Sequence, residues 1–293
     1  MSSDAKAFVM TTLQEVRKAF LSGLENIYST SEILVLYRMA AEHICGLSPL
    51  QIHLNPSLEI TSLQSTAFDD FLRRLIQQEP VQYILGYTWF TDVRIQVNPS
   101  VLIPRPETEE LVNILIERKT KKDPIILDAG TGSGCIAISL SKYLPEATVY
   151  AFDASEKAIK IAAENSSLNQ AKVDFFQADI LATPPSHLPM MDIIVSNPPY
   201  IPNAEASSLS PQVIDFEPNT ALFVPDDDPL LYYRGLIDWS KNLLKPEGII
   251  LAEIHPPMAS HLTDLFLSNE YENIEILCDL SGNKRFIFAT RPL

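Results

Sequence analysis

The spacing of hydrophobic residues divides the chain into a helical front part and an alternating back part. Over residues 1–86, apolar residues recur at three- and four-residue steps, as in amphipathic helices. The first of these helices shows the pattern at Phe8, Leu13, Val16, Phe20 and Leu24. Similar spacing returns in 32–45 and 66–78, and a break containing Ser, Pro and Asn separates these stretches at 46–57. The pattern predicts a small helical domain over residues 1–86.

The next segment, residues 87–122, has the features of a linker between two domains. Residues 87–103 alternate and are rich in aromatic and β-branched side chains, a pattern typical of a β-hairpin. A helix is then predicted from "PRPETEELVNILIERK", because prolines precede it and acidic residues fill its first turn, where the helix dipole favours negative charge. We expect a hairpin followed by a helix over 87–122.

Residues 123–293 show short apolar runs separated by longer segments. The strand-like runs cover 124–129, 148–153, 173–178, 191–196, 248–254, 273–280 and 284–290. The first five are separated by segments long enough for one helix each, which favours a parallel, doubly wound sheet. The last two are joined by "LSGNK", which is too short for a crossover, so we predict that this pair is antiparallel.

Composition and charge narrow the class of function. With 46% hydrophobic and 20% charged residues, the 293-residue chain has an ordinary globular composition. Its net charge of −15 disfavours a tight grip on nucleic acid, which needs clustered basic residues. We recognise no signal peptide and no apolar run of membrane-spanning length, and the five histidines form no metal-binding pattern. We therefore expect a cytoplasmic protein with no membrane association, no metal and no direct nucleic-acid partner.

A glycine-rich turn follows the first strand of the back part. The segment "ILDAGTGSGCIAISL" places Gly130, Gly132 and Gly134 close together, which allows a sharp turn and close approach of a ligand to the backbone amides. Asp153 closes the next strand about twenty residues on, where an acid accepts hydrogen bonds from ribose hydroxyls. A dinucleotide site is the main alternative, but its fingerprint is GxGxxG, whereas this chain has GxGxG.

Acids at three strand ends favour a different ligand. Asp128, Asp153 and Asp179 are expected to face one crevice at the carboxyl edge of the sheet. This arrangement suits a nucleoside with an amino-acid tail. We therefore predict that the cofactor is S-adenosyl-L-methionine and that the product is S-adenosyl-L-homocysteine.

The fourth strand ends in a stiff corner, Asn197-Pro198-Pro199-Tyr200. In an open parallel sheet this strand lies beside the first, at the switch point where ligands bind, so the corner is expected to face the methyl group. Asn197 Oδ1 and the Pro198 carbonyl would accept hydrogen bonds from an amide or aryl-amine nitrogen, and Tyr200 would stack on the acceptor group. Positioning of this kind supplies most of the acceleration. A Pro-Pro turn with a capping Asn is the structural alternative.

The chain resembles the PrmC/HemK family, the N5-glutamine methyltransferases of peptide chain release factors, over essentially its whole length. The segments that carry the resemblance are "PVQYILG", "VLIPRPETEEL", "LDAGTGSGCIAISL", "SNPPYIP" and "FEPNTAL". The NPPY corner is shared with adenine and cytosine amino-methyltransferases, whereas "PRPETE" at Pro104–Glu109 and the helical front domain single out this family. The resemblance implies a class I methyltransferase: a Rossmann-like α/β fold with a seven-stranded sheet and a terminal antiparallel hairpin, preceded by a small helical domain.

The resemblance also implies residue roles. The residues implied to bind the cofactor are Gly130, Thr131, Gly132, Ser133, Gly134, Asp153, Asp179, Ile180 and Asn197. The residues implied to hold the glutamine of a Gly-Gly-Gln loop are Asn197, Pro198, Pro199 and Tyr200, of which Asn197, Pro198 and Tyr200 are the catalytic residues. Ile180 stands where some members carry an aromatic residue, and His255 where members usually have glycine. The partner would be a class 1 release factor, recognised by residues 1–86, and we expect a monomer.

Two other functions are compatible with the same cofactor site. Methylation of a base in DNA or RNA would require base flipping and a charged channel, for which no basic or aromatic insert is evident. A non-enzymatic S-adenosylmethionine binder would leave the NPPY corner without a role.

Overall fold

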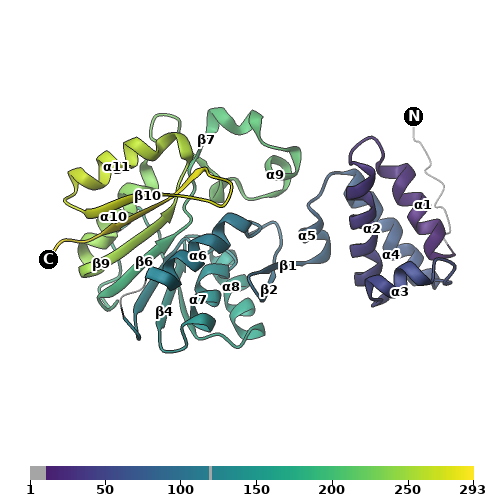
Figure 1. Cartoon of the computed structure of the whole chain (residues 1–293), viewed down its shortest axis with the longest axis horizontal. Coiled ribbons are helices and arrows are strands. Elements are labelled where there is room, and N and C mark those ends of the chain that lie inside the picture. Colours follow the sequence, from purple (N-terminus) through teal and green to yellow (C-terminus); the bar gives the residue numbers. More distant parts are fainter. Residues whose placement is uncertain (1–10, 119–120) are drawn as a thin grey trace. The chain divides into compact units, whose positions relative to one another are not determined.

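A glycine marks the boundary between the two parts of the chain. The computed structural model describes residues 11–118 and 121–293, and it separates into the units Met1–Gly86 and Tyr87–Leu293 (Figure 1). Gly86 has a φ of 78° and donates its N–H to the Gln82 carbonyl, which ends the last helix of the first unit. This left-handed conformation carries no steric penalty at glycine, so the helix stops cleanly at this residue.

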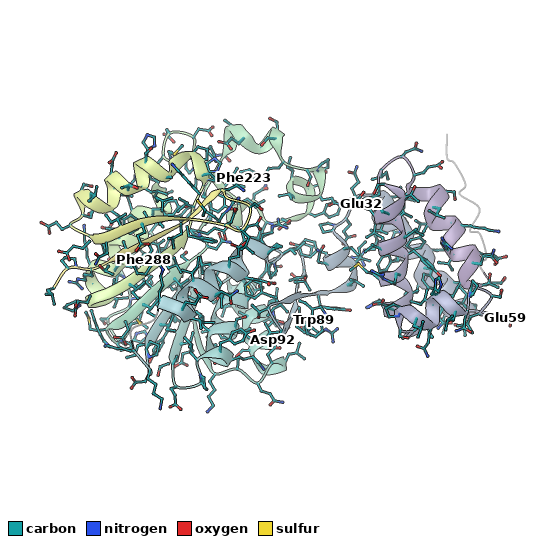
Figure 2. The ribbon with its side chains drawn as sticks, in the orientation of Figure 1. Glu32, Glu59, Trp89, Asp92, Phe223 and Phe288 are labelled. Carbon is teal, nitrogen blue, oxygen red and sulfur yellow. The ribbon has the colours of Figure 1, made fainter. Side chains whose placement is uncertain are left out.

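The described part of the first unit, residues 11–86, is helical apart from one isolated β-bridge between Thr12 and Glu59, and each helix buries apolar side chains. Its helices are α1 Leu13–Leu24, α2 Thr30–Cys45, α3 Pro49–Leu54, α4 Ser62–Ile76 and α5 Val81–Leu85. Ser or Thr caps α1 to α4, and in α2 the Ser29 N–H also donates to the Glu32 carboxylate, labelled in Figure 2. The predicted α1 face is fully buried from Leu13 to Leu24, whereas Phe8 lies outside the described residues. The centroid of the Phe20 ring lies 6.0 Å from that of Tyr37 and 6.4 Å from that of Phe68.

A hairpin and a helix open the second unit. Strands β1 Tyr87–Phe90 and β2 Val93–Gln96 pair antiparallel, and Trp89 and Asp92 lie on this hairpin in Figure 2. The hairpin ends at Gln96, earlier than the alternation over 87–103 indicates. Helix α6 spans Pro106–Arg118. The Gln96 N–H donates to Asn165 Oδ1 at 2.7 Å, which ties the hairpin to the helix that carries Asn165.

The main sheet of the second unit confirms the predicted seven strands. They are β3 Ile125–Ala129, β4 Thr148–Asp153, β5 Val173–Gln177, β6 Met191–Ser196, β9 Leu244–Glu253, β10 Glu272–Cys278 and β11 Lys284–Thr290. The strand order is β10-β11-β9-β6-β3-β4-β5. Strands β5, β4, β3, β6 and β9 pair in parallel, whereas β11 pairs antiparallel with both β9 and β10. As predicted, the fourth predicted strand, β6, lies beside the first, β3.

Helices cover both faces of this sheet. Side chains alternate along a strand, so Val149 and Ala151 of β4 pack with α7 (Cys135–Tyr143) on one face. On the other face, Phe152 stacks on Trp239 of α10 (Leu231–Leu243), with ring centroids 4.3 Å apart. Helix α8 (Glu156–Leu168) contacts α7, and α11 (Ala259–Ser268) contacts β10 and β11.

One predicted crossover helix is absent. Residues 178–190, between β5 and β6, form turns and coil, which corrects the expectation of a helix in every crossover. Prolines at 184, 185 and 189 remove backbone donors and prevent helix continuation in this segment. Instead, the Trp239 indole N–H donates to the Ala182 carbonyl at 2.7 Å and holds the segment against α10.

Short elements fill the connection between β6 and α10. They are β7 Ile201–Pro202, η1 Asn203–Ser208, α9 Pro211–Phe216, η2 Asn219–Ala221 and β8 Phe223–Val224, and η3 Pro256–Met258 precedes α11. Strands β7 and β8 pair in parallel and place the chain after the NPPY corner beside residues 223–224. Within the described part of the chain, every helix is too short or too polar to cross a membrane.

Candidate active site

A cavity of about 530 Å³ opens where the parallel strands end. The residues that follow β3, β4, β5 and β6 line one side of it, in the order that the sheet topology dictates. Residues from two further segments and from the start of α6 complete the lining: Ser100, Val101, Leu102, Pro104, Arg105, Thr108, Pro218, Thr220 and Ala221. Its volume is in the range of small-molecule sites, and its position at the switch between β3 and β6 is where open parallel sheets bind ligands.

The glycine turn brings backbone rather than side chains to this cavity. Gly130 and Gly132 have φ values of 73° and 54°, and a Cβ added at either would meet no atom within 4 Å. These positions therefore combine a left-handed backbone with open space beside the cavity, as a close ligand approach requires. Thr131 and Ser133 also line the cavity, although both residues are buried.

Gly134, predicted to bind the cofactor, is placed by the structure between two helices. It does not line the cavity; it stands at the N-cap of α7 with a φ of 83°. A Cβ added there would lie 3.1 Å from the Ala162 Cβ, so glycine allows α7 to pack closely against α8. We therefore assign Gly134 to helix packing.

The expectation that Asp128 faces the crevice is wrong. Its side chain is fully buried, and its Oδ2 accepts from the Thr131 hydroxyl at 2.6 Å and from the Ala137 N–H at 3.2 Å. Burial raises the pKa of Asp128 to about 7. A side chain at a strand end can point into the core as well as out of it. Asp128 points into the core, and its hydrogen bonds stabilise the glycine turn from the buried side.

Asp153 does line the cavity, at the end of β4. Its Oδ2 accepts from the Gly132 N–H at 2.9 Å and its Oδ1 from the Ser155 N–H at 2.8 Å. Burial raises the pKa of Asp153, and these backbone donors oppose that rise. Each carboxylate oxygen retains capacity for one more donor, which matches a pair of ligand hydroxyls.

Asp179 and Ile180 line the cavity beyond β5. Asp179 Oδ1 accepts from the Leu181 N–H at 2.9 Å, which orders this turn. Gly235 of α10 lies against it, because a Cβ at that position would be 2.8 Å from the Ile180 carbonyl oxygen. The buried Phe152 and Leu236 side chains complete an apolar wall.

The NPPY corner contributes three of its four residues to the cavity lining: Asn197, Pro198 and Pro199. Asn197 Nδ2 donates to the Thr108 hydroxyl at 3.1 Å. Its Oδ1 receives no hydrogen bond from the residues that the structure describes, and it is not a buried unpaired atom. An acceptor oxygen is therefore available at the cavity.

Tyr200 is anchored outside the cavity lining. Its hydroxyl donates to Glu253 Oε1 at 2.9 Å, and burial together with this carboxylate raises the pKa of Tyr200. Its ring lies nearly parallel to His255, at 12° with centroids 6.0 Å apart. His255 in turn lies 3.1 Å from Glu205. The unusual His255 thus packs on the corner and joins it to η1.

Glu253, at the end of β9, is a site residue that the sequence reasoning missed. Its side chain is buried, with Oε2 accepting from the Thr108 hydroxyl at 2.9 Å and Oε1 from Tyr200. Burial raises the pKa of Glu253, against the lowering effect of these hydrogen bonds. The available signals were an acid at a strand end and the unassigned PRPETE segment, which contributes Thr108.

A partly buried ion pair joins two of the quoted motifs beside the cavity. The Arg105 guanidinium lies 2.6 Å from Glu217 Oε1, and the Ile103 N–H donates to Glu217 Oε2 at 3.2 Å. Glu217 is buried and belongs to the "FEPNTAL" segment, whereas Arg105 belongs to PRPETE. This contact holds residues 218–221 over the cavity, and nothing in the sequence spacing indicated it.

These features define the class of the protein as a methyltransferase of the class I fold. A Pyrococcus furiosus methyltransferase structure matches with a TM-score of 0.52 and 14% identity, over 69% of this chain and 91% of that one. The hMettl16 catalytic domain, in complex with MAT2A 3′UTR hairpin 6, matches with a TM-score of 0.52 and 16% identity, over 68% of this chain and 74% of that one. At these identities the likeness concerns the fold alone.

Sequence comparison identifies the family. The PrmC N-terminal domain model matches residues 15–86, and the methyltransferase small domain model matches residues 107–214. A release factor glutamine methyltransferase of Bacteroides thetaiotaomicron is 37% identical, over 92% of this chain and 96% of that one. Another release factor glutamine methyltransferase, of Flavobacterium psychrophilum, is 38% identical, over 94% of this chain and 98% of that one. The chain belongs to the release factor glutamine methyltransferase family.

Proposed function

We propose that this protein transfers a methyl group from S-adenosyl-L-methionine to the side-chain amide nitrogen, N5, of the glutamine in the Gly-Gly-Gln motif of peptide chain release factors, and so supports translation termination. The observation that carries this proposal is the position of Asn197, which lines the cavity, has its Nδ2 held by Thr108 and leaves its Oδ1 without a partner among the described residues. Family membership supplies the acceptor, because the relatives are named for it.

The cavity wall beyond β3, β4 and β5 suits the cofactor. Gly130 and Gly132 leave the space that side chains would fill, and Asp153 retains acceptor capacity for ribose hydroxyls. The turn at Asp179 and Ile180 supplies a polar edge and an apolar face for adenine. When bound, the cofactor supplies an electrophilic methyl group on a sulfonium ion. Thr131 and Ser133 contribute their backbone, since both side chains are buried.

The NPPY corner would act by holding the acceptor nitrogen. Asn197 Oδ1 and the Pro198 carbonyl each accept one N–H of the glutamine amide and aim its nitrogen lone pair at the methyl carbon. The nitrogen forms the new bond, the carbon–sulfur bond breaks, and the electron pair stays on sulfur. The methylated amide cation is strongly acidic and loses its proton to water, so no strong protein base is needed. Positioning and electrostatic complementarity supply the acceleration.

Tyr200 and Pro199 would shape the acceptor subsite. The two prolines fix the backbone and thereby hold the Pro198 carbonyl in place. The Tyr200 ring is held by its hydroxyl on Glu253 and by His255. We propose that this fixed ring packs against the planar glutamine amide and closes one side of the subsite.

The two units would divide the work. We propose that residues 1–86 recognise the release factor, that 87–122 connect the units, and that 123–293 bind the cofactor and perform the chemistry. All the cofactor candidates lie in the second unit, and a family-specific helical domain precedes them. We further propose a monomer in the cytoplasm that acts on a protein partner without contacting nucleic acid or membrane directly.

Methyl transfer from tritium-labelled S-adenosylmethionine tests this function. The acceptors are an intact class 1 release factor, the same factor with Asn in place of the Gly-Gly-Gln glutamine, plasmid DNA and total tRNA. We expect label only in the intact factor. Label in either nucleic acid, or equal label in both factors, would overturn the proposal.

A further inference from the structure

A hydrogen-bond chain runs from the end of β9 through α6 to the NPPY corner. Glu253 Oε2 accepts from the Thr108 hydroxyl at 2.9 Å, and the same hydroxyl oxygen accepts from Asn197 Nδ2 at 3.1 Å. Thr108 and Glu253 are each only 2% exposed, so water does not compete for these bonds. The segments that meet here are far apart in sequence.

We infer that Thr108 is a positioning residue for Asn197 and that buried Glu253 sets the direction of the hydrogen bonds connecting them. This inference rests on the proposed function, and it concerns how the corner is aimed. Thr108 belongs to the PRPETE segment, to whose residues no individual role was assigned. Neither Thr108 nor Glu253 is required to touch the acceptor nitrogen.

The donor-to-acceptor direction of these hydrogen bonds follows from the number of protons that each group can donate. An ionised carboxylate can only accept, so Glu253 takes the single hydroxyl proton of Thr108. The Thr108 oxygen can then offer only lone pairs to Asn197, and it selects the Nδ2 end of that amide. Asn197 Oδ1 is thereby turned to the cavity, where an acceptor is required. Without this chain, the Asn197 amide could rotate by half a turn and present a donor to the glutamine N–H groups.

Glu253 also holds Tyr200, the last residue of the NPPY corner. Its Oε1 accepts from the Tyr200 hydroxyl at 2.9 Å, and its backbone carbonyl accepts from the Tyr233 hydroxyl at 2.9 Å. One buried carboxylate therefore anchors both Asn197, through Thr108, and Tyr200 directly. A hydrogen-bond network with a buried, fully partnered carboxylate at its centre restricts the motion of the groups it holds, and catalysis by positioning requires this restriction.

The test compares Thr108→Val, which removes the hydroxyl at nearly constant shape, with Thr108→Ser, which retains it. Single-turnover methylation of an intact release factor is measured together with KM and S-adenosylmethionine affinity. We expect Thr108→Val to lower the rate by roughly 10- to 100-fold, with cofactor affinity unchanged, and Thr108→Ser to recover most of it. Thr263→Val is the matched control, because within the described residues the Thr263 hydroxyl bonds the Ala259 carbonyl of α11 and no other group, and its rate should match the wild type.

A double mutant separates positioning from general structural damage. If Thr108 acts through Asn197, adding Thr108→Val to Asn197→Ala should lower the residual rate no further. A wild-type rate in Thr108→Val, failure of Thr108→Ser to recover activity, or full additivity in the double mutant would overturn the inference. Absence of methyl transfer by the wild-type protein would instead contradict the proposed function, so the two failures are distinguishable.

Discussion

The role of each side chain in this site depends largely on how many hydrogen bonds it can donate or accept. Each carboxylate oxygen of Asp153 accepts from one backbone amide and can accept another donor. Asp128 instead accepts from Thr131 and Ala137 through Oδ2, and its Oδ1 is buried without a partner among the described residues. The two acids are of the same type and each is one of the last two residues of its strand, yet only Asp153 lines the cavity. Their roles therefore differ because of the direction in which each side chain leaves its strand.

Replacing Asp153 with Ala should weaken cofactor binding. A lost charge-assisted hydrogen-bond pair costs about 1.5–3 kcal/mol, which corresponds to roughly 10- to 150-fold in Kd. Titration calorimetry with S-adenosylmethionine measures this directly. Asp174→Ala is the control, since Asp174 is exposed on β5 outside the cavity. Equal affinity in the folded Asp153 and Asp174 variants would contradict the ribose assignment.

The raised pKa of Glu253 predicts loss of activity on the acid side. Around Glu253 lie Tyr200, Tyr233, Arg285 and Glu107; burial raises its pKa most, Glu107 adds to the rise, and Arg285 opposes it. As pH falls through this raised pKa, the carboxyl gains a proton, ceases to be only an acceptor, and no longer fixes the Thr108 hydroxyl. On acidification, the rate should therefore begin to decrease at a higher pH than the titration of an exposed glutamate, whose pKa is about 4.3, would predict.

The control for this pH profile is Glu253→Gln, which cannot titrate. It should be slower than the wild type at neutral pH and should lack the acid-side decrease. Single-turnover rates across the pH range, with cofactor saturating, give both curves. An unchanged acid-side decrease in Glu253→Gln would assign the titration to another group.

Among the secondary-structure elements, α10 positions the cavity wall without contributing a charged group to it. Gly235 allows this helix to lie against the turn at Ile180, because no Cβ intervenes. On the same helix, Trp239 stacks on Phe152 and donates to the Ala182 carbonyl. The helix-free segment 178–190 is thus held in place by α10, which explains how a proline-containing crossover can form an ordered wall.

Gly235→Ala should displace the Asp179–Ile180 turn and weaken cofactor binding. The added Cβ would lie 2.8 Å from the Ile180 carbonyl oxygen, so backbone must move. Overpacking of this kind costs about 1–3 kcal/mol, and we expect about a tenfold increase in Kd for S-adenosylmethionine. Gly23→Ala in α1 is the matched control, because its Cβ would make an ordinary 3.4 Å contact with Leu72. Thermal unfolding and calorimetry distinguish the two, and equal cofactor affinity in both variants would refute the role of Gly235.

The whole molecule consists of two units with separate cores. The apolar α1 face is buried within the first unit, and the helices that cover the sheet belong to the second. All residues that line the cavity lie in the second unit. Recognition of a protein substrate and binding of the cofactor can therefore be separated by experiment.

Removal of residues 1–86 should leave cofactor affinity unchanged and abolish methylation of a whole release factor. The reason is that the truncated chain keeps the entire cavity but loses the domain that we assign to substrate recognition. Circular dichroism and calorimetry with S-adenosylmethionine confirm that the remaining unit is folded. A full rate on the release factor by this folded fragment would show that recognition resides elsewhere.

Local patterns in the sequence were sufficient for the strands, the glycine turn and the NPPY corner. The hydrophobic patterns that predict strands involve residues close together in sequence, so they can be recognised without the fold. The parallel topology inferred from them then placed the end of β6 beside the end of β3. The absent helix at 178–190 shows the limit of this reasoning, since a segment of adequate length need not be helical when it contains prolines.

The contacts that orient the site required the folded chain. Thr108 and Glu253 are 145 residues apart, Thr108 and Asn197 are 89 apart, and Arg105 and Glu217 are 112 apart. Periodicity and motif spacing carry no information about such pairs, because they depend on how separate elements pack. The same holds for the burial of Asp128 away from the cavity and for the anchoring of the Tyr200 hydroxyl on Glu253, which both depend on partners supplied by packing. Sequence alone therefore placed the candidate groups at the strand ends, because motifs and strand patterns are local, and packing decided which of these groups line the cavity.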